Sequence, residues 1–502
     1  MSDNLEIDPA IDEVYARALD ARDARFDGVF FVGITSTGIY CRPICPARVS
    51  HPERRRFFTS AAAAERAGYR PCLRCRPELA PGRAACDAVS RLARAATSRI
   101  AAGALNGRAV ADLARELGVG ERHLRRVLER EMGVSPIELA LTHRLLLAKR
   151  LLADTRLPVT RIAYASGFQS LRRFNAAFRE RYRLSPSELR RPESRSASGR
   201  DDDFVRLSLA YRPPLAWAAL LQLLQRDAVR GIDAVEGDRY LSAVRVGGHV
   251  GAIVARDGAS GRRAGVARHS VEVDVTASLL PVLMAVIARV RHLFDLDAEP
   301  SVIDVQLAQG GLGRLVEAHR GVRVAGGLDG FDVALRVLLR RASRSQTAYE
   351  SLAWRLTASL GEAVDVGLPS LHHLAPDARR VAATDVHAIT SLGVGERFAT
   401  VIVDVARAVA AGRVLLEPGC DPRDVARELS AAGVDEQSIA HILARAAAWP
   451  DSFPARDLTS SAIEWSSLRK RAERWRPWRA YAAMHLRIDD MAAHDAPSFR
   501  AG

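Results

Sequence analysis

The stretch Cys41-Arg-Pro-Ile-Cys45 is followed along the chain by a second closely spaced pair, Cys72-Leu-Arg-Cys75. Two such pairs on tight turns place four thiolates tetrahedrally around Zn²⁺. In a segment of about 70 residues, a metal ion of this kind supplies much of the folding free energy. The spacing therefore predicts a small zinc-bound domain, and by itself it indicates a purely structural metal site.

The charge of the chain is distributed unevenly. The 502 residues predict several domains and carry a formal net charge of +14. Residues 81–200 account for +13 of it, whereas residues 1–80 carry +1 and residues 201–502 are neutral. A polyanion is therefore the expected partner of residues 81–200. The sequence contains no apolar stretch of membrane-spanning length and no signal peptide, so we expect a cytoplasmic protein with reduced cysteines.

The basic segment contains two copies of a helix–turn–helix pattern. The first copy begins with Val110-Ala-Asp-Leu-Ala-Arg-Glu-Leu-Gly118 and the second with Val159-Thr-Arg-Ile-Ala-Tyr-Ala-Ser-Gly167. They end alike, in Met132-Gly-Val-Ser-Pro136 and Tyr182-Arg-Leu-Ser-Pro186. The second helix of such a pair fits the major groove of DNA. The candidate DNA-contacting residues on the two second helices are Arg122, His123, Arg125, Arg126, Gln169, Ser170, Arg172 and Arg173.

The residues around the cysteines, Thr35-Ser-Thr-Gly-Ile-Tyr40 and Gly68-Tyr-Arg-Pro71 among them, closely resemble the N-terminal domain of the Ada family over residues 10–80. The resemblance implies that Cys41 removes a methyl group from a methyl phosphotriester in DNA. It also implies that the remaining zinc ligands are Cys45, Cys72 and Cys75, and the candidate DNA contacts of this domain are Arg42, Arg48 and Arg70.

The chemistry implied by this resemblance is coherent. Zinc keeps a thiol deprotonated at neutral pH. Methylation of one thiolate makes the metal centre less negative by one charge, which lowers its repulsion from DNA. Residues 85–192 resemble an AraC-type DNA-binding domain, so the two resemblances together imply a damage-sensing transcriptional activator, with RNA polymerase as an expected partner. A zinc-containing transcription factor without methyl transfer is the alternative.

The C-terminal half begins after a polar linker and changes character along its length. Period-2 runs at 240–246 and 270–275 predict strands, and a helix is expected at 278–294. From Phe331 to about Arg487 the pattern is largely helical. We therefore expect a multidomain α+β chain in which a zinc domain and an all-α double helix–turn–helix domain precede a β-rich domain and a helical bundle. The expected boundaries are 1–82, 83–192, 193–203 for the linker, 204–325, 326–490 and 491–502 for the tail.

Four motifs and His485 resemble AlkA-type DNA-3-methyladenine glycosylases over about 204–490. The motifs are Tyr211-Arg-Pro-Pro-Leu-Ala-Trp217, Leu293-Phe-Asp-Leu296, Gly330-Phe-Asp-Val-Ala-Leu-Arg-Val-Leu338 and Ala472-Glu-Arg-Trp-Arg-Pro-Trp-Arg-Ala-Tyr481. The resemblance implies a β-rich domain before a helix–hairpin–helix bundle that flips an alkylated base out of the duplex. It places Asp457 near the aspartate that stabilises the sugar cation. Asp457 is also suited to be a helix N-cap, and the two roles are compatible.

The sequence departs from the glycosylase pattern at three places. The hairpin Ala432-Gly433-Val434-Asp435-Glu436 keeps one glycine and puts carboxylates where a DNA phosphate is bound in the family. Arginines replace a Gln-rich stretch at 340–344, and the base-stacking aromatic residues are replaced by Gln437, His441 and Arg487. Two alternatives follow: a methyl-accepting activator fused to an active base-excision glycosylase, or a damage-sensing regulator whose glycosylase domain is inactive.

Overall fold

The structure is a computed structural model, which describes residues 9–48, 50–82, 84, 90–190, 203–258, 262–263, 266–267, 269–455, 458 and 462–495. The chain divides into two structural units. The first unit comprises residues 1–212, 246–251 and 257–288, and the second comprises residues 213–245, 252–256 and 289–502. The finer division into domains remains a prediction. No helix of the described part is long and apolar enough to cross a membrane.

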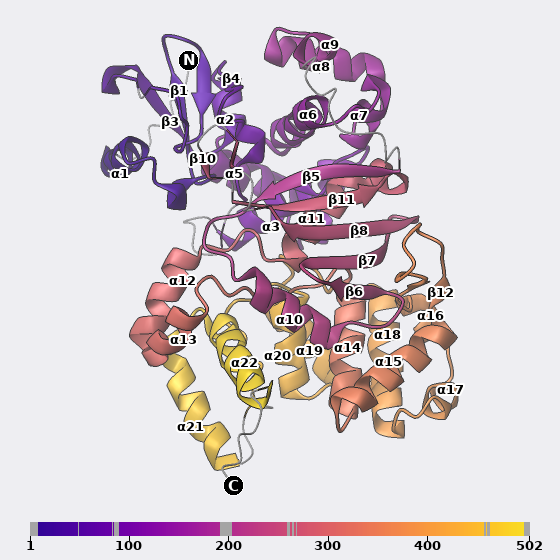
Figure 1. Cartoon of the computed structure of the whole chain (residues 1–502). Coiled ribbons are helices and arrows are strands. Elements are labelled where there is room, and N and C mark those ends of the chain that lie inside the picture. Colours follow the sequence, from indigo (N-terminus) through magenta and orange to yellow (C-terminus); the bar gives the residue numbers. More distant parts are fainter. Residues whose placement is uncertain are drawn as a thin grey trace. The chain divides into compact units, whose positions relative to one another are not determined.

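The N-terminal part of the first unit is a small mixed sheet with two helices (Figure 1). The sheet has the strand order β3-β1-β2-β4, and only β2 and β4 run parallel. Its aromatic side chains Phe30, Phe31, Tyr40 and Phe58 are buried. The elements are α1 (Pro9–Asp20), β1 (Phe31–Ile34), β2 (Ile39–Cys41), β3 (Arg55–Phe58), α2 (Ala61–Arg66), β4 (Arg70–Pro71) and the 3₁₀ helix η3 (Pro77–Leu79).

Two helix–turn–helix pairs follow, as the sequence predicts. The helices are α3 (Arg91–Ala101), α4 (Val110–Glu116), α5 (Glu121–Met132), α6 (Pro136–Asp154), α7 (Val159–Ala165), α8 (Leu171–Tyr182) and α9 (Pro186–Leu189). Gly118 and Gly167 have φ of +67° and +85° at the two turns, a conformation that glycine adopts at little cost. The shared Ser-Pro endings are capping boxes, in which Ser135 and Ser185 cap α6 and α9.

A five-stranded sheet has the order β5-β11-β8-β7-β6. The predicted strands at 240–246 and 270–275 correspond to β7 and β11. The predicted helix 278–294 starts as a 3₁₀ segment that contains Pro281, because proline has no amide to donate to an α-helical ladder. The elements of this region are β5 (Phe204–Ala210), α10 (Trp217–Asp227), β6 (Asp233–Glu236), β7 (Arg239–Val246), β8 (His249–Asp257), β9 (Arg262–Arg263), β10 (Val266–Ala267), β11 (Ser270–Thr276), η5 (Ala277–Val282) and α11 (Leu283–Leu293).

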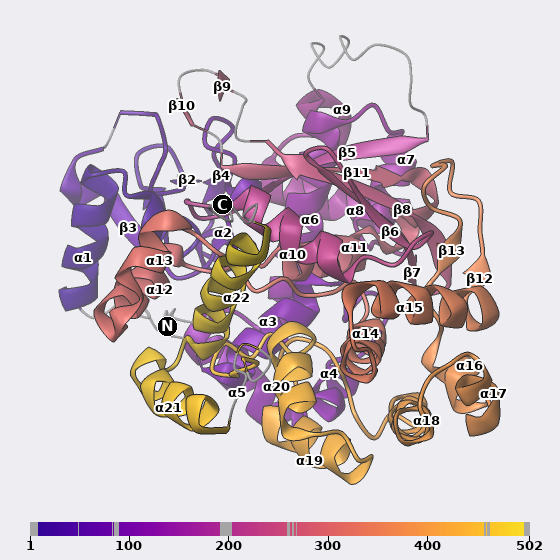
Figure 2. The same cartoon turned by 60° about the horizontal axis from the view of Figure 1, so that its bottom comes forward.

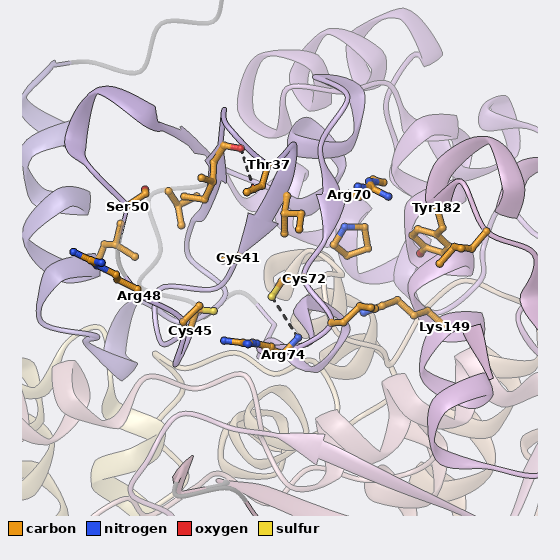
Figure 3. Close-up of a pocket in the computed structure, with 18 of the residues that line it drawn as sticks. Thr37, Cys41, Cys45, Arg48, Ser50, Arg70, Cys72, Arg74, Lys149 and Tyr182 are labelled. Atoms are coloured by element: carbon orange, nitrogen blue, oxygen red, sulfur yellow. Dashed lines mark hydrogen bonds between the residues drawn. The ribbon is translucent and has the colours of Figure 1, made fainter. Parts of the chain in front are cut away.

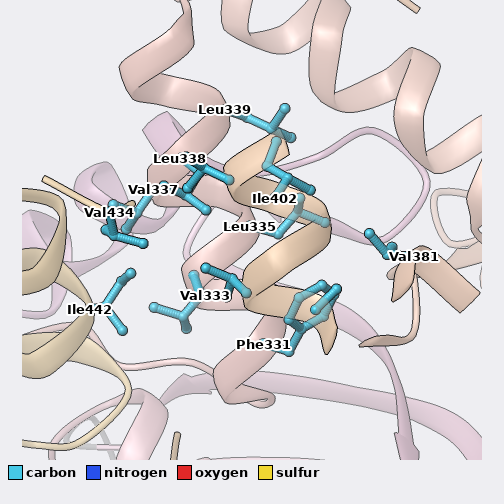
Figure 4. Packing of buried hydrophobic residues seen from close by; sticks show 14 of the residues in the cluster. Phe331, Val333, Leu335, Val337, Leu338, Leu339, Val381, Ile402, Val434 and Ile442 are labelled. Atoms are coloured by element: carbon cyan, nitrogen blue, oxygen red, sulfur yellow. The ribbon is translucent and has the colours of Figure 1, made fainter. Parts of the chain in front are cut away.

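The C-terminal part of the second unit is a helical bundle (Figures 1 and 2). Its helices are α12 (Pro300–Leu307), α13 (Gly313–Ala318), α14 (Gly330–Ala342), α15 (Gln346–Leu360), α16 (Ala378–Ala382), α17 (Val386–Ser391), α18 (Glu396–Ala410), α19 (Pro422–Ala431), α20 (Glu436–Arg445), α21 (Ala462–Ala472) and α22 (Arg479–Asp495). The central helix α14 packs against α15, α18 and α20. Figure 4 shows its side chains Phe331, Leu335 and Leu338 packed with Ile402 of α18 in the bundle core.

Candidate metal centre and nucleic-acid interface

The parallel pairing of β2 and β4 brings the two cysteine pairs together. Tyr40 is in register with Pro71, so the next residues on the two strands are Cys41 and Cys72. The Cys72 amide donates a hydrogen bond to the Tyr40 carbonyl oxygen at 3.0 Å. On the other side, the Cys45 amide closes a turn by donating to the Arg42 carbonyl oxygen at 3.1 Å. The sulfurs of all four cysteines consequently lie within 4.8 Å of one another.

The environment of these sulfurs suits thiolates around a cation. The backbone amides of Arg42 and Arg74 donate to the Sγ atoms of Cys75 and Cys72, each at 3.3 Å. Hydrogen bonds among the four cysteines lower the pKa of the Cys72 thiol and raise the pKa of the Cys41 and Cys75 thiols. Four thiolates at this separation repel one another, so they remain ionised together only around a positive ion. Four cysteines in this arrangement are a closed, tetrahedral zinc donor set.

A cavity of about 500 Å³ adjoins the cluster, and Figure 3 shows the residues that line it. Three of the four cysteines, Cys41, Cys45 and Cys72, contribute to its wall, whereas Cys75 does not. Arg48, Arg70 and Arg74 also line the cavity, and all three are exposed. No ion-pair partner of these three guanidinium groups occurs among the residues that the structure describes. The cavity is therefore lined by buried cysteine sulfurs and by exposed, positively charged arginine side chains.

Arg42 differs from the other arginines predicted to contact DNA. Its side chain is buried, with the residue only 8% exposed. The guanidinium group forms an ion pair with Asp27, to which Nε donates at 2.8 Å, and it donates to the Cys75 carbonyl oxygen at 3.1 Å. Arg42 thus supports the cysteine loop from inside, and its prediction as a DNA contact has to be corrected because Asp27 and Cys75 already occupy its donors. Arg48 and Arg70 remain predictions.

The structure places all eight residues predicted for the helix–turn–helix pairs at the start of α5 and α8. The most exposed of them are Arg122, His123, Arg126, Gln169, Arg172 and Arg173. Arg125 is half-buried and paired with Glu121 at 2.6 Å, and Ser170 caps α8 by accepting a hydrogen bond from the Arg173 amide. Each set therefore presents two exposed arginines on one helix that have no ion-pair partner among the described residues, as binding to a DNA groove requires.

In the C-terminal half, Asp457, which the sequence predicts as a catalytic carboxylate, lies outside the described residues. Pro454 precedes Asp457 by three residues in the sequence, and its carbonyl oxygen accepts hydrogen bonds from His441 at 2.9 Å and from Arg487 at 3.2 Å. Arg487 also lies 3.2 Å from the His441 ring. His441 and Arg487, two of the residues predicted to replace aromatic side chains, therefore contact the backbone of Pro454, three residues before Asp457 in the sequence.

The hairpin between α19 and α20 has a carboxylate at the start of its second helix. Asp435 is the N-cap of α20, and its Oδ1 accepts hydrogen bonds from the amides of Gln437 and Ser438 at 3.1 Å each. Although burial works in the opposite direction, hydrogen bonds from Ser438 lower the pKa of Asp435. These amides are therefore already bonded to a negative group of the protein itself.

The arginines at 340–344, which replace the family's Gln-rich stretch, have different surroundings. Arg340 stacks on Tyr349, with its guanidinium carbon 3.9 Å from the ring centroid, and it pairs with Asp227 at 3.0 Å. Arg341 is exposed and pairs with Asp435 at 3.7 Å, and Arg344 is exposed. Arg340 therefore links α14 to α15 and α10, and Arg341 and Arg344 are the two that face solvent.

Two groups near the metal centre were missed at the level of sequence. One is Arg74, which is exposed and lines the cavity, as Arg70 does. Its position between the ligands Cys72 and Cys75 was the sequence signal that could have identified it. The other is a set of residues from the helix–turn–helix pairs, Lys149, Tyr182, Leu184 and Leu189, which line the same cavity. No sequence pattern links these residues to the cysteines, because their proximity arises only from packing.

Three family models match the chain in sequence order. The metal binding domain of Ada matches residues 14–78, a helix-turn-helix domain matches 113–192 and the AlkA N-terminal domain matches 206–329. A Mycobacterium tuberculosis protein named "Probable bifunctional transcriptional activator/DNA repair enzyme AlkA" is 32% identical over 488 residues, which cover 94% of this chain and 95% of that protein. The chain belongs to this bifunctional activator and repair family.

Two Escherichia coli proteins are each similar to a separate part of the present chain. DNA-3-methyladenine glycosylase 2 is 27% identical over 289 residues, which cover 56% of this chain and 95% of that protein. The bifunctional transcriptional activator/DNA repair enzyme Ada is 48% identical over 60 residues, 12% of this chain and 17% of that protein. The four cysteines of the bifunctional chain thus form an Ada-type zinc site. The match over nearly the whole glycosylase favours a bifunctional protein over a regulator with an inactive second half.

Proposed function

We propose that this protein accepts a methyl group from a DNA methyl phosphotriester on Cys41, activates transcription in its methylated form, and excises alkylated bases with its C-terminal half. The observation on which the first part rests is the position of Cys41, at the end of β2 and in the wall of a cavity with a positively charged rim. The methylated phosphate is neutral and its neighbours along the strand are anionic, so the exposed arginines bind the neighbouring phosphates.

Three differences among the sulfurs favour Cys41 as the nucleophile. Cys75 does not line the cavity, and both Cys75 and Cys72 accept a backbone N–H hydrogen bond that withdraws electron density from sulfur. Cys45 accepts a hydrogen bond from the Ala47 backbone. Among the described residues, no backbone amide donates to Cys41. Cys41 therefore combines access with the most electron-rich sulfur.

The transfer is a displacement at the methyl carbon. Zinc, when bound, keeps the cysteine sulfurs ionised at neutral pH. A bond forms between Cys41 Sγ and the methyl carbon while the carbon–oxygen bond of the triester breaks, and its electron pair remains on the phosphate oxygen. Cys41 becomes a neutral thioether and the triester becomes an anionic diester, so no proton or co-reactant is needed. The metal centre loses one negative charge and is repelled less by DNA, which strengthens promoter binding.

A mass measurement tests the assignment of Cys41. The full-length protein is incubated with a duplex that contains one methyl phosphotriester, and the adduct is located by peptide mass spectrometry. We expect one methyl group on Cys41, none in Cys41→Ser, and an unchanged adduct in the control Cys420→Ser, which changes a cysteine of the second unit. A methyl group on Cys72 or Cys45 in the unaltered protein would overturn the assignment.

For the C-terminal half we propose N-glycosidic hydrolysis with Asp457 as the carboxylate that stabilises the developing sugar cation. The support is the family membership together with the likeness to the glycosylase over 95% of that enzyme's length. We expect release of 3-methyladenine from methylated DNA by the full-length protein and its loss in Asp457→Asn. Asp451→Asn is the control. Asp451 lies six residues before Asp457, and its carboxylate is already paired with Arg476 and Arg479. Release at an equal rate by Asp457→Asn would contradict the assignment.

The regulatory part of the proposal concerns the two helix–turn–helix pairs. We propose that they hold promoter DNA persistently, through the exposed basic residues of α5 and α8, and that the methylated protein recruits RNA polymerase in the cytoplasm. Nearly all of the net positive charge lies in this segment, which supports a lasting interaction with DNA. Transcription in vitro with purified polymerase, with and without prior methylation of Cys41, tests the recruitment.

A further inference from the structure

The cavity at Cys41 has walls from two parts of the first unit. The zinc-binding part contributes the cysteines, Ile34, Ile39 and Leu73, and the helix–turn–helix part contributes Lys149, Tyr182, Leu184 and Leu189. Figure 3 shows Lys149 and Tyr182 on the side of Cys72 and Arg70. The contact is made by α8, which packs against β4 directly before Cys72. The second helix–turn–helix pair is therefore part of the surroundings of the metal centre.

The wall from the helix–turn–helix part is apolar where it faces the cavity. Tyr182 is buried in the aromatic row that it forms with Phe178. The ammonium group of Lys149 forms an ion pair with Glu78, which leaves its hydrocarbon stem as the part available to the cavity. Leu184 is 37% exposed, and Leu73 of the zinc-binding part, which lines the same cavity, is 52% exposed. Together with Lys149 and Tyr182, these leucines give the cavity an apolar wall that can contact a methyl group.

Polar contacts hold the helix–turn–helix part against the zinc-binding part. Arg76, the residue after the last cysteine, donates to both carboxylate oxygens of Asp154 on α6, at 2.7 and 2.8 Å. Ser60 donates to the Met132 carbonyl oxygen at 2.8 Å, and Arg181 pairs with the buried Glu65 at 2.9 Å. Because most of these partners are at least partly buried, water competes with them weakly.

We infer that the second helix–turn–helix pair completes the methyl-acceptor pocket, and that Leu184 and Leu189 determine its selectivity for a neutral methylated phosphate over an ionised one. This inference rests on the proposed methyl transfer to Cys41. A methyl phosphotriester has no net charge and presents a methyl group, so contact with leucine side chains stabilises it. An ordinary phosphodiester is anionic, and the same contact would remove water from its charge without replacing it.

The reaction itself reinforces this selectivity. Breaking the methyl–oxygen bond converts the neutral triester into an anionic diester while Cys41 becomes a neutral thioether. The leucine wall therefore favours the substrate over the product and promotes release of the repaired strand. The exposed arginines Arg48, Arg70 and Arg74 remain bound to flanking phosphates, whose charge does not change in the reaction.

Single-turnover kinetics with the full-length protein test the inference. The substrate is a duplex with one methyl phosphotriester at a concentration below its dissociation constant, so that the rate includes binding, and the variants are Leu184→Ala, Leu184→Met and the control Ile137→Ala. Ile137 is an exposed apolar residue of α6 that does not line the cavity. We expect the transfer rate to fall about fivefold in Leu184→Ala, since about three carbon groups no longer contact the methyl group, and to stay near the unaltered rate in the other two.

Three further measurements separate positioning from other effects. Zinc content should stay unchanged in Leu184→Ala, and so should the rate of Cys41 methylation by methyl iodide, which needs no positioning. Affinity for unmodified duplex should not fall, because the leucine contact disfavours an ionised phosphate. Equal transfer rates on the phosphotriester duplex in Leu184→Ala and the unaltered protein would overturn the inference. Absence of a methyl adduct on Cys41 in the unaltered protein would instead overturn the proposed methyl transfer on which the inference rests.

Discussion

Glu78 and Lys149 form an ion pair in which both side chains are almost fully buried, 1% and 3% exposed. Glu78 follows the last zinc ligand by three residues, and Lys149 lies in the C-terminal half of α6. Arg76 binds the same carboxylate at 2.9 Å and extends the network to Asp154. The loop that leaves the metal centre is thereby attached to the helix that connects the two helix–turn–helix pairs.

Replacing one member of this pair should destabilise the first unit strongly. In Lys149→Met, Glu78 keeps only Arg76 as a cationic partner, and a buried charge that has lost its partner costs about 3 kcal/mol or more. Hydrogen exchange of the α6 amides measures the loss. The control is Arg115→Met, which removes the exposed pair with Asp112, and it should cost about 0.5 kcal/mol or less. Similar costs for the two variants would contradict the importance of burial.

The stability of the first unit should also depend on pH through Glu78. Burial alone would raise the pKa of Glu78, but the charges of Lys149 and Arg76 lower it below its ordinary value of 4.5. A carboxyl group with a lowered pKa contributes stability that is complete above the unfolded pKa and is lost as the pH falls through the folded one. We therefore expect stability to fall below a pH of 4.5. Urea unfolding at several pH values should show a smaller decline in Glu78→Gln.

Removal of zinc should unfold the cysteine loops before the helices. Without the metal, the four thiolates repel one another and the register of β2 and β4 loses its support. The amide of Cys72, which donates to Tyr40, should then exchange much faster with deuterium. The amides of α5 should keep their protection, because Leu124 and Leu128 belong to a separate core. Chelation that released zinc without changing exchange at Cys72 would show that the sheet holds the loops unaided.

The exposed arginines of the two second helices should contribute to DNA binding in distinguishable ways. Arg126→Ala and Arg173→Ala should each cost about 1–3 kcal/mol on a specific operator if the side chain contacts a base, or lower the salt slope by about 1 if it contacts a phosphate. Arg130, in the last turn of α5 and paired with Glu131 at 2.8 Å, is the matched control. Arg130→Ala with an effect as large as Arg126→Ala would show that the DNA contact extends to the last turn of α5 and is not confined to its start.

The hairpin of the glycosylase half should bind DNA more tightly without its carboxylate. Asp435→Gly frees the amides of Gln437 and Ser438 for a DNA phosphate, at the expense of about 1 kcal/mol of helix capping. Affinity for duplex DNA should rise and its salt dependence should steepen by about one phosphate contact. Asp421→Gly removes the equivalent cap of α19, outside the hairpin turn, and should leave DNA binding unchanged. Unchanged affinity in Asp435→Gly would mean that this hairpin does not contact DNA.

Much of this site could be predicted from sequence because its signals are local. The two cysteine pairs are each spaced within one turn, and the two copies of the helix–turn–helix pattern repeat their glycine turns and Ser-Pro caps. Arg42 shows the limit of such patterns. Arg48, Arg70 and Arg74 near the cysteines are exposed, yet the side chain of Arg42 is buried against Asp27, a residue whose position in the sequence gives no sign of the contact.

The sequence by itself determined the zinc donor set, the duplicated DNA-binding helices and the membership in a family with a glycosylase half, since each depends on residue types at short spacings. The tertiary structure alone decided which sulfurs reach the cavity, because the parallel register of β2 and β4 places Cys41 beside Cys72 and leaves Cys75 behind. It also decided that Leu184 lies at the cavity. Contacts between residues far apart along the chain depend on how whole elements pack, and no local pattern records that packing.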